Sequence, residues 1–305
     1  MQHIFILNPA AGKTRRALDY REQIDEYANT HPDFIYEIHV TASPKDATAF
    51  VHRRCEESAG KLRFYALGGD GTLSEVYNGM AGYSHAELAS LPCGSANDCV
   101  KCFDNSEQFT CLPLLINGTA RSIDAMTCNG KAALNLASLG LDADVAERMT
   151  KFKYWPLVSG SMAYNLAVIA SLFHRLGHPL DITIEDECGR IVSLTGTFLF
   201  ALAANGRYYG GGYHAAPSAV AWDGLLDFVM IQKVSRLRIL RLLKVYKAGR
   251  HIDLPICRHF QGRRMTVKTP KAGAINLDGE VLSATEAVFE IRPNALNFVF
   301  PAPSA

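Results

Sequence analysis

Acidic and amide side chains lie in three glycine-containing stretches that are far apart in the sequence: GGDGT at 68–72, PCGSAND at 92–98 and NLDGE at 276–280. Glycine lets another group approach the backbone closely, and a glycine-rich turn entering a helix offers unpaired N–H groups that suit phosphate. The Asp70 carboxylate would repel phosphate unless a divalent cation lay between them, and Asp98 adds a second carboxylate. Together the three stretches predict a phosphate site that uses a metal ion.

Each stretch has a plainer interpretation when it is taken alone. Asp70 would cap the helix that follows its turn, and residues 95–98 would form an N-cap cluster. Asp278-Gly279 is a common hairpin turn signal. Only the occurrence of all three in one chain favours phosphate chemistry.

Two familiar nucleotide-binding motifs match this sequence only in part. Gly12-Lys13-Thr14 ends like a Walker A loop, but the first glycine of that loop would fall at Leu7. Gly69-Asp70-Gly71 begins like a dinucleotide fingerprint, but its third glycine would fall at Ser74. Phosphate binding in this chain must therefore use another arrangement.

Strand-like and helix-like patterns alternate over residues 1–127 and must position the first two stretches. The strand-like runs are HIFILNP, FIYEIHVT, LRFYAL and AELASLPCG. Helix-like segments run over 14–28 and 45–57, from the glycine turn to about 79, and from Ser95 onward. Such alternation predicts a parallel sheet with helices on its faces, and the turns after its strands collect at one edge.

From residue 128 the pattern changes to short strand-like runs separated by Gly, Pro or acidic turns. This pattern predicts a sheet-on-sheet domain over 128–290, interrupted by helices near 157–176 and 235–248. The last run, LNFVF within 291–305, is expected to return to the first domain.

Composition limits the classes of partner and compartment. The net charge of +1 gives no general argument for nucleic-acid binding. The N-terminal residues lack a basic segment and a long apolar segment, so we expect no secretory signal. The best membrane-span candidate, 155–176, contains several polar residues and favours a buried helix, so no transmembrane segment is expected.

Eight cysteines in a chain without a signal suggest reduced thiols in a cytoplasmic protein. Cys99 and Cys102 have C-x-x-C spacing, but a zinc site would want a second pair. Cys93 and Cys111 are the nearby candidates and are irregularly spaced. Packing is therefore favoured over a metal or redox role.

Six motifs together carry a resemblance that covers nearly the whole chain. In order, they are ILNPAAGK, GGDGTLSEV, PCGSAND, NGRYYGGG, APSAVAWDGLLD and NLDGE. The chain resembles the bacterial diacylglycerol kinase and lipid kinase family, whose catalytic region is related to that of sphingosine kinases. GGDGT alone is shared with NAD kinases. Ser95 stands where threonine is usual, and its hydroxyl should keep the nucleotide contact.

The resemblance implies an α/β plus all-β fold. It implies a three-layer α/β nucleotide-binding domain over 1–127, similar to those of phosphofructokinases and NAD kinases, and a C-terminal β-sandwich over 128–290 for the lipid substrate. It places ATP in the cleft between them. The family's nucleotide contacts carry over to these residues: Asn8, Pro9, Ala10, Ala11, Gly12, Thr41, Gly68, Gly69, Asp70, Gly71, Thr72, Leu73, Ser74 and Ser95.

The resemblance also implies catalytic roles and two Mg²⁺ sites. Glu280 is the leading candidate for the proton acceptor, with Asp278 beside it. Asp70 and Asp98 would hold the catalytic Mg²⁺. The family's separate structural Mg²⁺ would be bound by the Asp223 carboxylate and the carbonyls of Val220 and Leu225. Without the resemblance, an ordinary Asp-Gly turn is preferred at Asp223.

The expected activity is ATP- and Mg²⁺-dependent phosphorylation of a lipid hydroxyl, with diacylglycerol the leading acceptor and phosphatidic acid the product. The alternatives are an NAD kinase and a non-catalytic nucleotide or lipid sensor on the same scaffold. Nothing in the sequence decides the oligomeric state, and a homodimer stays open.

A kinase of a membrane lipid has to meet the bilayer, which here means a peripheral position at the inner face of the membrane. Residues 231–250 contain seven Lys or Arg, no Asp or Glu, and leucines at 237, 240, 242 and 243. A basic amphipathic helix of this kind can lie on an anionic membrane. The alternative is a helix that packs its leucines on the sandwich and exposes its charges to water.

Overall fold

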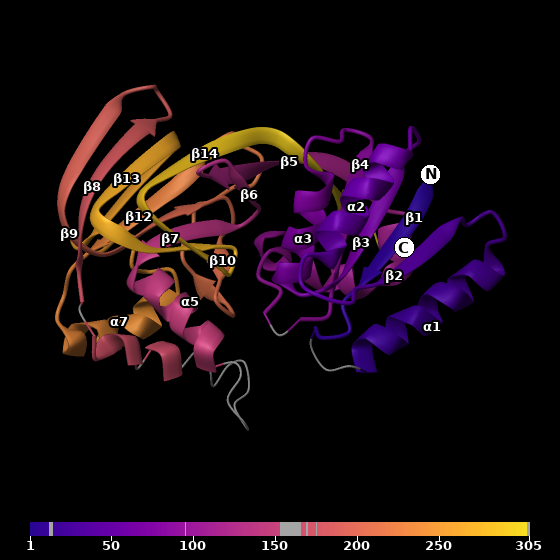
Figure 1. The fold of residues 1–305 in the computed structure, drawn as a ribbon, viewed down its shortest axis with the longest axis horizontal. Coiled ribbons are helices and arrows are strands. Elements are labelled where there is room, and N and C mark those ends of the chain that lie inside the picture. The colour runs from indigo at the N-terminus through magenta and orange to yellow at the C-terminus, as the bar shows by residue number, and fades with distance from the viewer. Residues whose placement is uncertain (12–14, 95, 153–165, 169, 175, 304–305) are drawn as a thin grey trace. The chain divides into compact units, whose positions relative to one another are not determined.

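The computed structural model describes residues 1–11, 15–94, 96–152, 166–168, 170–174 and 176–303. The chain forms two compact units (Figure 1). Unit 1 combines Met1–Asp124 with Asn294–Ala305, and unit 2 is Ala125–Pro293. The last segment of the chain thus belongs to the same unit as the first.

Unit 1 is a parallel α/β sheet with strand order β4-β3-β1-β2. Its elements are β1 (Gln2–Leu7), α1 (Arg15–Thr30), β2 (Tyr36–Val40), α2 (Asp46–Glu57), β3 (Leu62–Gly68), α3 (Asp70–Met80), β4 (Ala86–Pro92) and α4 (Leu112–Ile116). β3 and β4 are buried along their whole length, as expected for strands with both faces covered. α2 packs on α3, and α1 on α4. The end of β14 (Glu280–Phe300) adds a strand beside β4, where Phe298 pairs with Leu88 in parallel.

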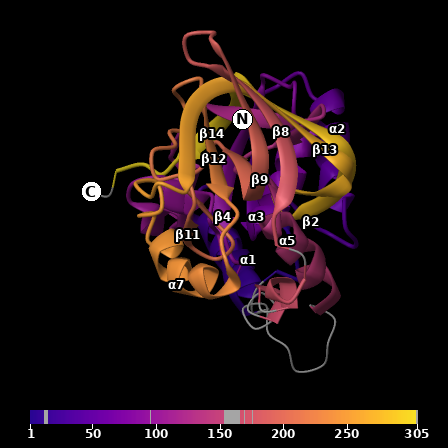
Figure 2. The same ribbon diagram turned by 90° about the vertical axis from the view of Figure 1, so that its left-hand side faces the viewer.

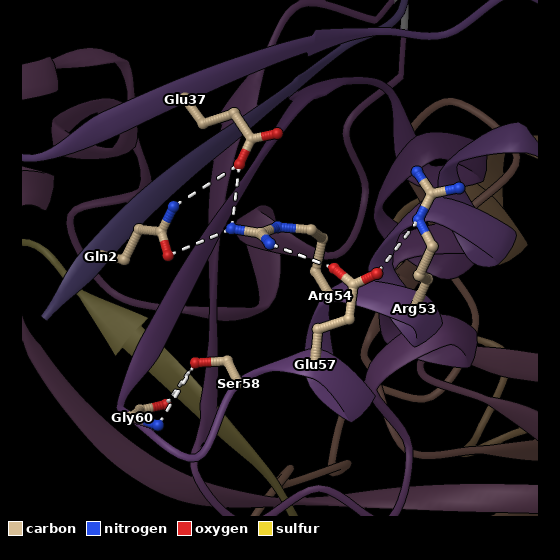
Figure 3. Close-up of polar contacts among 7 residues, drawn as sticks. All are labelled: Gln2, Glu37, Arg53, Arg54, Glu57, Ser58 and Gly60. Atoms are coloured by element: carbon tan, nitrogen blue, oxygen red, sulfur yellow. Dashed lines mark hydrogen bonds and ion pairs between the residues drawn. The ribbon is translucent and has the colours of Figure 1, made fainter.

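A polar cluster fastens α2 to the edge of this sheet (Figure 3). The Arg54 guanidinium lies 3.2 Å from both the Glu37 carboxylate and the side-chain oxygen of Gln2, and 3.3 Å from the Glu57 carboxylate. Gln2 comes from β1, Glu37 from β2 and Glu57 from the end of α2. One arginine therefore links three elements of unit 1.

The helix predicted from Ser95 onward is wrong. After β4 the described chain forms two short 3-10 turns, Val100–Cys102 and Ser106–Thr110, instead of an α-helix. Asn97 has φ 53°, a left-handed conformation that an α-helix cannot include. Cys99 and Cys102 are both buried, so they pack as the sequence suggested.

Unit 2 is built from long antiparallel strands (Figures 1 and 2). Its elements are β6 (Lys131–Ala133), β7 (Leu136–Gly140), α5 (Leu141–Phe152), β8 (His178–Asp186), β9 (Ile191–Ala204), β10 (Tyr208–Tyr209), β11 (Tyr213–His214), β12 (Leu226–Gln232), α7 (Arg236–Lys247), β13 (Cys257–Leu277) and most of β14; β5 (Thr119–Cys128) leads into it. β8 pairs with β9, β9 with β12, β12 with β13, and β13 back to β8. β7 joins β9 to β13 as well. These pairings make the predicted sandwich.

Two apolar clusters stabilise unit 2. One fills the interior of the sandwich and includes Phe228, Met265 and Phe289. The other joins side chains of α5 and α7 to side chains of β9 and β12. Figure 1 shows both helices below the strands. Fully burying one such side chain contributes about 1.5–3 kcal/mol.

The structure also tests the predicted helices of the second domain. α7 confirms the helix expected near 235–248. Most of the one expected at 157–176 lies outside the described residues. α5 was not predicted, although Leu141, Val145 and Met149 recur at helical spacing in its sequence. Within the described ranges, no helix combines the length and the apolar character needed to cross a membrane.

Candidate functional site

The turns after β1, β3 and β4 lie against one another in unit 1. The Asn8 side-chain amide donates to the Thr72 hydroxyl at 2.9 Å, and its backbone N–H donates to the Leu67 carbonyl at 3.1 Å. The N–H of Cys93, after β4, donates to the Gly68 carbonyl at 2.8 Å. Segments from three strands thus meet at the carboxyl edge of the sheet, as the parallel topology predicts.

Two glycines of these turns are required by close packing. A Cβ at Gly68 would collide with the Thr72 side chain, and a Cβ at Gly94 would lie 2.5 Å from the Gly69 Cα. Gly71, by contrast, has open space around it. Gly69 and Gly94 therefore let the β3 and β4 turns touch backbone to backbone.

Asp70 holds the two turns together. Its carboxylate accepts the backbone N–H groups of Asp98 and Cys99, each at 3.0 Å. It thus fixes the two residues that lead into the 3-10 turn Val100–Cys102, while its own helix α3 begins without a side-chain cap. Burial raises the pKa of Asp70, and the two amide hydrogen bonds partly oppose this shift.

Asp98 provides a second carboxylate beside Asp70. Its side chain is buried, and the Lys101 ammonium donates to it at 2.8 Å. The neighbouring Asn97 side chain accepts from the Gly94 N–H and donates to the Gly94 carbonyl, both at 2.9 Å. The PCGSAND segment is therefore fixed by its own side chains and by Asp70.

The donors at this edge suit Mg²⁺ in kind. Asp70 and Asp98 offer only oxygen, which Mg²⁺ prefers, and Mg²⁺ usually takes one or two carboxylates and completes its shell with water and phosphate. No group of three or more His, Cys, Asp or Glu that could hold a metal occurs in the described part of the chain. A metal held by these two carboxylates would therefore need ligands from water or from the nucleotide.

The other predicted nucleotide contacts differ in accessibility. Pro9 and Ala10 are exposed after β1, and Thr41 follows β2, where its N–H donates to the Leu7 carbonyl at 2.9 Å. The Leu73 side chain is buried, so only its backbone could reach a ligand. Ser74 is half-buried in the first half of α3. Gly12 and Ser95 lie outside the described residues.

In unit 2 the NLDGE motif forms the hairpin between β13 and β14. Asp278 has φ 48° and Gly279 φ 92°, and Leu277 pairs with Glu280, which is the geometry of a tight two-residue turn. The Asp278 carboxylate accepts three consecutive backbone N–H groups, those of residues 134, 135 and 136, at 2.6, 3.1 and 2.9 Å. Asp278 thus anchors the segment that leads into β7, while Glu280 is exposed.

A buried polar network that the sequence did not reveal lies behind this hairpin. The Asp142 carboxylate accepts hydrogen bonds from Ser138 and from the Tyr209 hydroxyl, the latter at 2.6 Å. The Tyr246 hydroxyl donates to that of Tyr209 at 3.1 Å, and the Asn276 amide lies 3.5 Å from Asp142. Burial raises the pKa of Asp142 and outweighs the hydrogen bonds that lower it. The aspartate two residues after a buried strand, in LGLDAD, was the available signal.

Asn276 connects this network to the hairpin itself. Its side-chain oxygen accepts the Gly279 N–H at 2.9 Å. The first residue of NLDGE therefore touches both the turn and the buried carboxyl group of Asp142.

An apolar cavity of unit 2 has this network in its wall. Its volume is about 80 Å³, whereas a cavity of about 10–15 Å³ is enough to hold one water molecule. It is lined by Leu141, Asp142, Val145, Val168, Leu199, Phe200, Tyr209, Tyr213, Ile231, Val234, Ile239, Leu242, Leu243 and Tyr246. The cavity thus lies between α5, the strands and the inner face of α7, and its lining suits an apolar ligand.

The residues of the predicted structural Mg²⁺ site form an Asp-Gly turn, the alternative that the sequence alone favoured. The Leu225 N–H donates to the Asp223 carboxylate at 2.9 Å, and Gly224 has φ 76°. One carboxylate and two carbonyls, from Val220 and Leu225, are oxygen donors of the kind that Mg²⁺ accepts. The turn is therefore compatible with the predicted metal.

Comparison with known proteins matches both halves of the chain. Residues 2–128 match the model of the diacylglycerol kinase catalytic domain. Residues 135–300, more than half of the chain, match that of the YegS C-terminal NAD kinase beta sandwich-like domain.

Curated relatives and a solved structure agree with these matches. A "Probable lipid kinase YegS-like" of Shewanella frigidimarina is 29% identical over 95% of this chain and 92% of its own length. One of the same name from Pseudomonas aeruginosa is 31% identical over 88% of this chain and 85% of its own. The crystal structure of a diacylglycerol kinase from Bacillus anthracis superposes with a TM-score of 0.68 at 18% identity, covering 98% and 96% of the two chains, and shows the shared fold. The chain belongs to the diacylglycerol kinase-like, YegS-like family of lipid kinases.

Proposed function

We propose that this lipid kinase uses ATP and Mg²⁺ to phosphorylate the free hydroxyl of diacylglycerol, giving phosphatidic acid. The observation that carries the proposal is the meeting of the β1, β3 and β4 turns around Asp70 and Asp98. Phosphoryl transfer depends mainly on positioning and on offsetting the charge of the phosphates. Backbone N–H groups beside two carboxylates are suited to that task.

On the nucleotide side, the backbone from Gly69 to Thr72 at the start of α3 would bind phosphate oxygens. Asp70 and Asp98 would hold Mg²⁺, which when bound neutralises charge on the transferred phosphoryl group. Lys101 already contacts Asp98 and would lie near that charge as well. Since Asp70 also fixes the turn after β4, it would act both as a ligand and as a support.

On the acceptor side, Glu280 is the better proton acceptor of the DGE pair. The Asp278 carboxylate already accepts hydrogen bonds from three backbone N–H groups, which occupy both of its oxygens. Glu280 is exposed at the same hairpin and is accessible to a lipid hydroxyl. The role of Asp278 would be to hold the hairpin in place.

The cavity under α7 would receive an acyl chain. Its walls are aliphatic and aromatic, and Asp142 is the only acidic or basic side chain in its lining as the structure describes it. Such a lining favours an uncharged lipid tail over the nicotinamide nucleotide that an NAD kinase would bind. The kinase would then meet its substrate as a peripheral protein at the cytoplasmic face of a membrane.

The test is phosphate transfer from labelled ATP by the purified protein, with Mg²⁺ or with EDTA. The acceptors are diacylglycerol, monoacylglycerol, a sphingoid base, a polyprenol and NAD. We expect labelled phosphatidic acid, formed only with Mg²⁺. Label in NADP would support the NAD kinase alternative. ATP binding with no labelled product would instead support the sensor.

A further inference from the structure

Two segments of unit 2 lack acidic residues and meet in the fold. The described residues 166–168 and 170–174, and the segment 228–252, contain no Asp or Glu. The Arg236 guanidinium, at the start of α7, donates to the carbonyls of Leu172 and His174 at 2.6 and 3.1 Å. Leu172 and Ile239, one from each segment, also belong to the same apolar cluster. The fold thus places the basic helix α7 beside a second segment whose described residues carry no negative charge.

Large apolar side chains are exposed at the same place. Phe173 is 80% exposed, and on α7 Leu237 and Leu240 are 61% and 50% exposed. Scattered single apolar side chains are normal on a protein surface, but these three lie on two segments that are in direct contact. On α7 the two exposed leucines alternate with the exposed cations Arg238, Arg241 and Lys244.

The opposite face of α7 explains why the helix stays folded while these side chains are exposed. Ile239 and Tyr246 are buried, and Leu242 and Leu243 line the apolar cavity. The helix therefore has a packed inner face and a basic, partly apolar outer face. Packing on the sandwich accounts for the inner face, and the membrane interpretation of the outer face stays a prediction. The outer residues of the helix are not needed for the core.

We propose that the outer face of α7 and Phe173 form one docking surface for an anionic lipid bilayer. The charge complementarity is direct, because the exposed cations Arg238, Arg241 and Lys244 of α7 would meet the negative surface of the membrane. Phe173, Leu237 and Leu240 would enter the boundary between head groups and acyl chains, as the apolar side of an interfacial helix does. Docked this way, α7 separates the bilayer from the cavity that it lines, so a lipid tail would need to pass only one helix. This surface rests on the proposed function, because only a membrane-borne substrate requires it.

The test is sedimentation with phosphatidylcholine vesicles, with and without phosphatidylglycerol, in the absence of ATP and diacylglycerol. We expect the protein to bind when phosphatidylglycerol is present and to dissociate as salt is raised. The triple variant R238E, R241E and K244E should bind about a hundredfold more weakly. The triple variant F173S, L237S and L240S should lose binding by about tenfold or more.

Two controls carry charge-reversing or Ser substitutions elsewhere on the surface. The variant K61E, R263E and K271E reverses three exposed cations outside the surface, and I191S removes an exposed apolar side chain of β9. Both should sediment like the parent protein. Equal losses in a control, or binding that ignores phosphatidylglycerol, would overturn the proposal. So would a concentration-dependent dimer that the F173S, L237S and L240S variant abolishes, because the surface would then bind a second copy of the chain.

A second assay separates this surface from the proposed function. With a short-chain, water-soluble diacylglycerol, both surface variants should turn over like the parent, since their side chains do not line the cavity. Retained turnover together with lost vesicle binding supports the surface. Vesicle binding through this face by a protein that phosphorylates no lipid would also support the surface and would defeat the proposed function alone.

Discussion

The glycine turn at Gly68–Thr72 in unit 1 and the Asp278–Gly279 hairpin in unit 2 use an aspartate in the same way. Asp70 accepts two backbone N–H groups of a neighbouring segment, and Asp278 accepts three. Their companion carboxylates differ, because Asp98 is buried beside Lys101 whereas Glu280 is exposed. An aspartate in a functional motif can therefore link two loops through hydrogen bonds. Its chemical role has to be tested separately from this structural role.

The largest effect should come from Asp70→Asn. We expect turnover to fall by about a thousandfold, the size of losing a preorganised electrostatic contact in an active site. Stability should fall by only about 1–3 kcal/mol, because an amide group facing two N–H donors satisfies one of them. Kinase assays together with urea unfolding would measure the two losses separately. Near-parental turnover would contradict a catalytic role for Asp70 and leave it only the structural role of linking the two turns.

Substitutions of Asp278 and Glu280 should separate a catalytic role from a structural role within one hairpin. Glu280→Gln should lower kcat by about a hundredfold or more, as for a lost general base, with unfolding unchanged. Asp278→Asn should lower the free energy of unfolding by about 1–3 kcal/mol, because a buried amide loses its acceptor. If Glu280→Gln destabilised the protein while Asp278→Asn did not, the two assignments would have to be exchanged.

Glycines of the same motif should differ in unit 1. Gly68→Ala should destabilise by about 1–3 kcal/mol, since its Cβ would meet the Thr72 side chain. Gly71→Ala enters open space in α3 and should leave stability unchanged or raise it by up to about 1 kcal/mol. Thermal unfolding of the two variants would show the contrast. Equal melting temperatures would mean that the β3 turn is less tightly packed than the distances require.

The smallest effect concerns the pH dependence of unit 2. The pKa of Asp142 is raised above its usual 3.8 in the folded state, so the folded protein binds the proton more tightly than the unfolded chain does. Stability contributed by that proton is present at low pH and is lost as pH rises from about 4 through the raised pKa. Asp142→Asn should flatten this part of the stability profile. A variant profile parallel to that of the parent would show that Asp142 does not titrate abnormally.

Local patterns predicted much of the fold. The buried runs of β1, β3 and β4 and the alternating runs of β8 and β9 could be recognised because burial on two faces or on one leaves a direct pattern in the residues. The Ser95 helix was a wrong prediction because it depended on a distant residue: Asp70 takes the amides that an α-helix would have used. The two-domain fold class itself is confirmed.

The polar site of unit 2 could not be found in the same way. Asp142 bonds with Tyr209 and Asn276, which follow it by 67 and 134 positions along the chain. Tyr246 joins the network through the Tyr209 hydroxyl. No local spacing encodes such a meeting. The hydrogen bonds from the backbone of residues 134–136 to Asp278 could not be predicted for the same reason. The Asp-Gly pair predicts the turn but not what the carboxylate binds.

β14 has a consequence for how the protein is made. Its last residues complete the sheet of unit 1, where Phe298 is fully buried beside β4 and the Ala302 N–H donates to the Leu114 carbonyl at 2.9 Å. During synthesis the ribosome releases these residues only after all of unit 2. Until then the sheet edge at β4 stays open. A fragment ending at residue 124 would therefore expose the apolar side chains that Phe298 covers, such as Phe103 and Phe109, and would tend to aggregate.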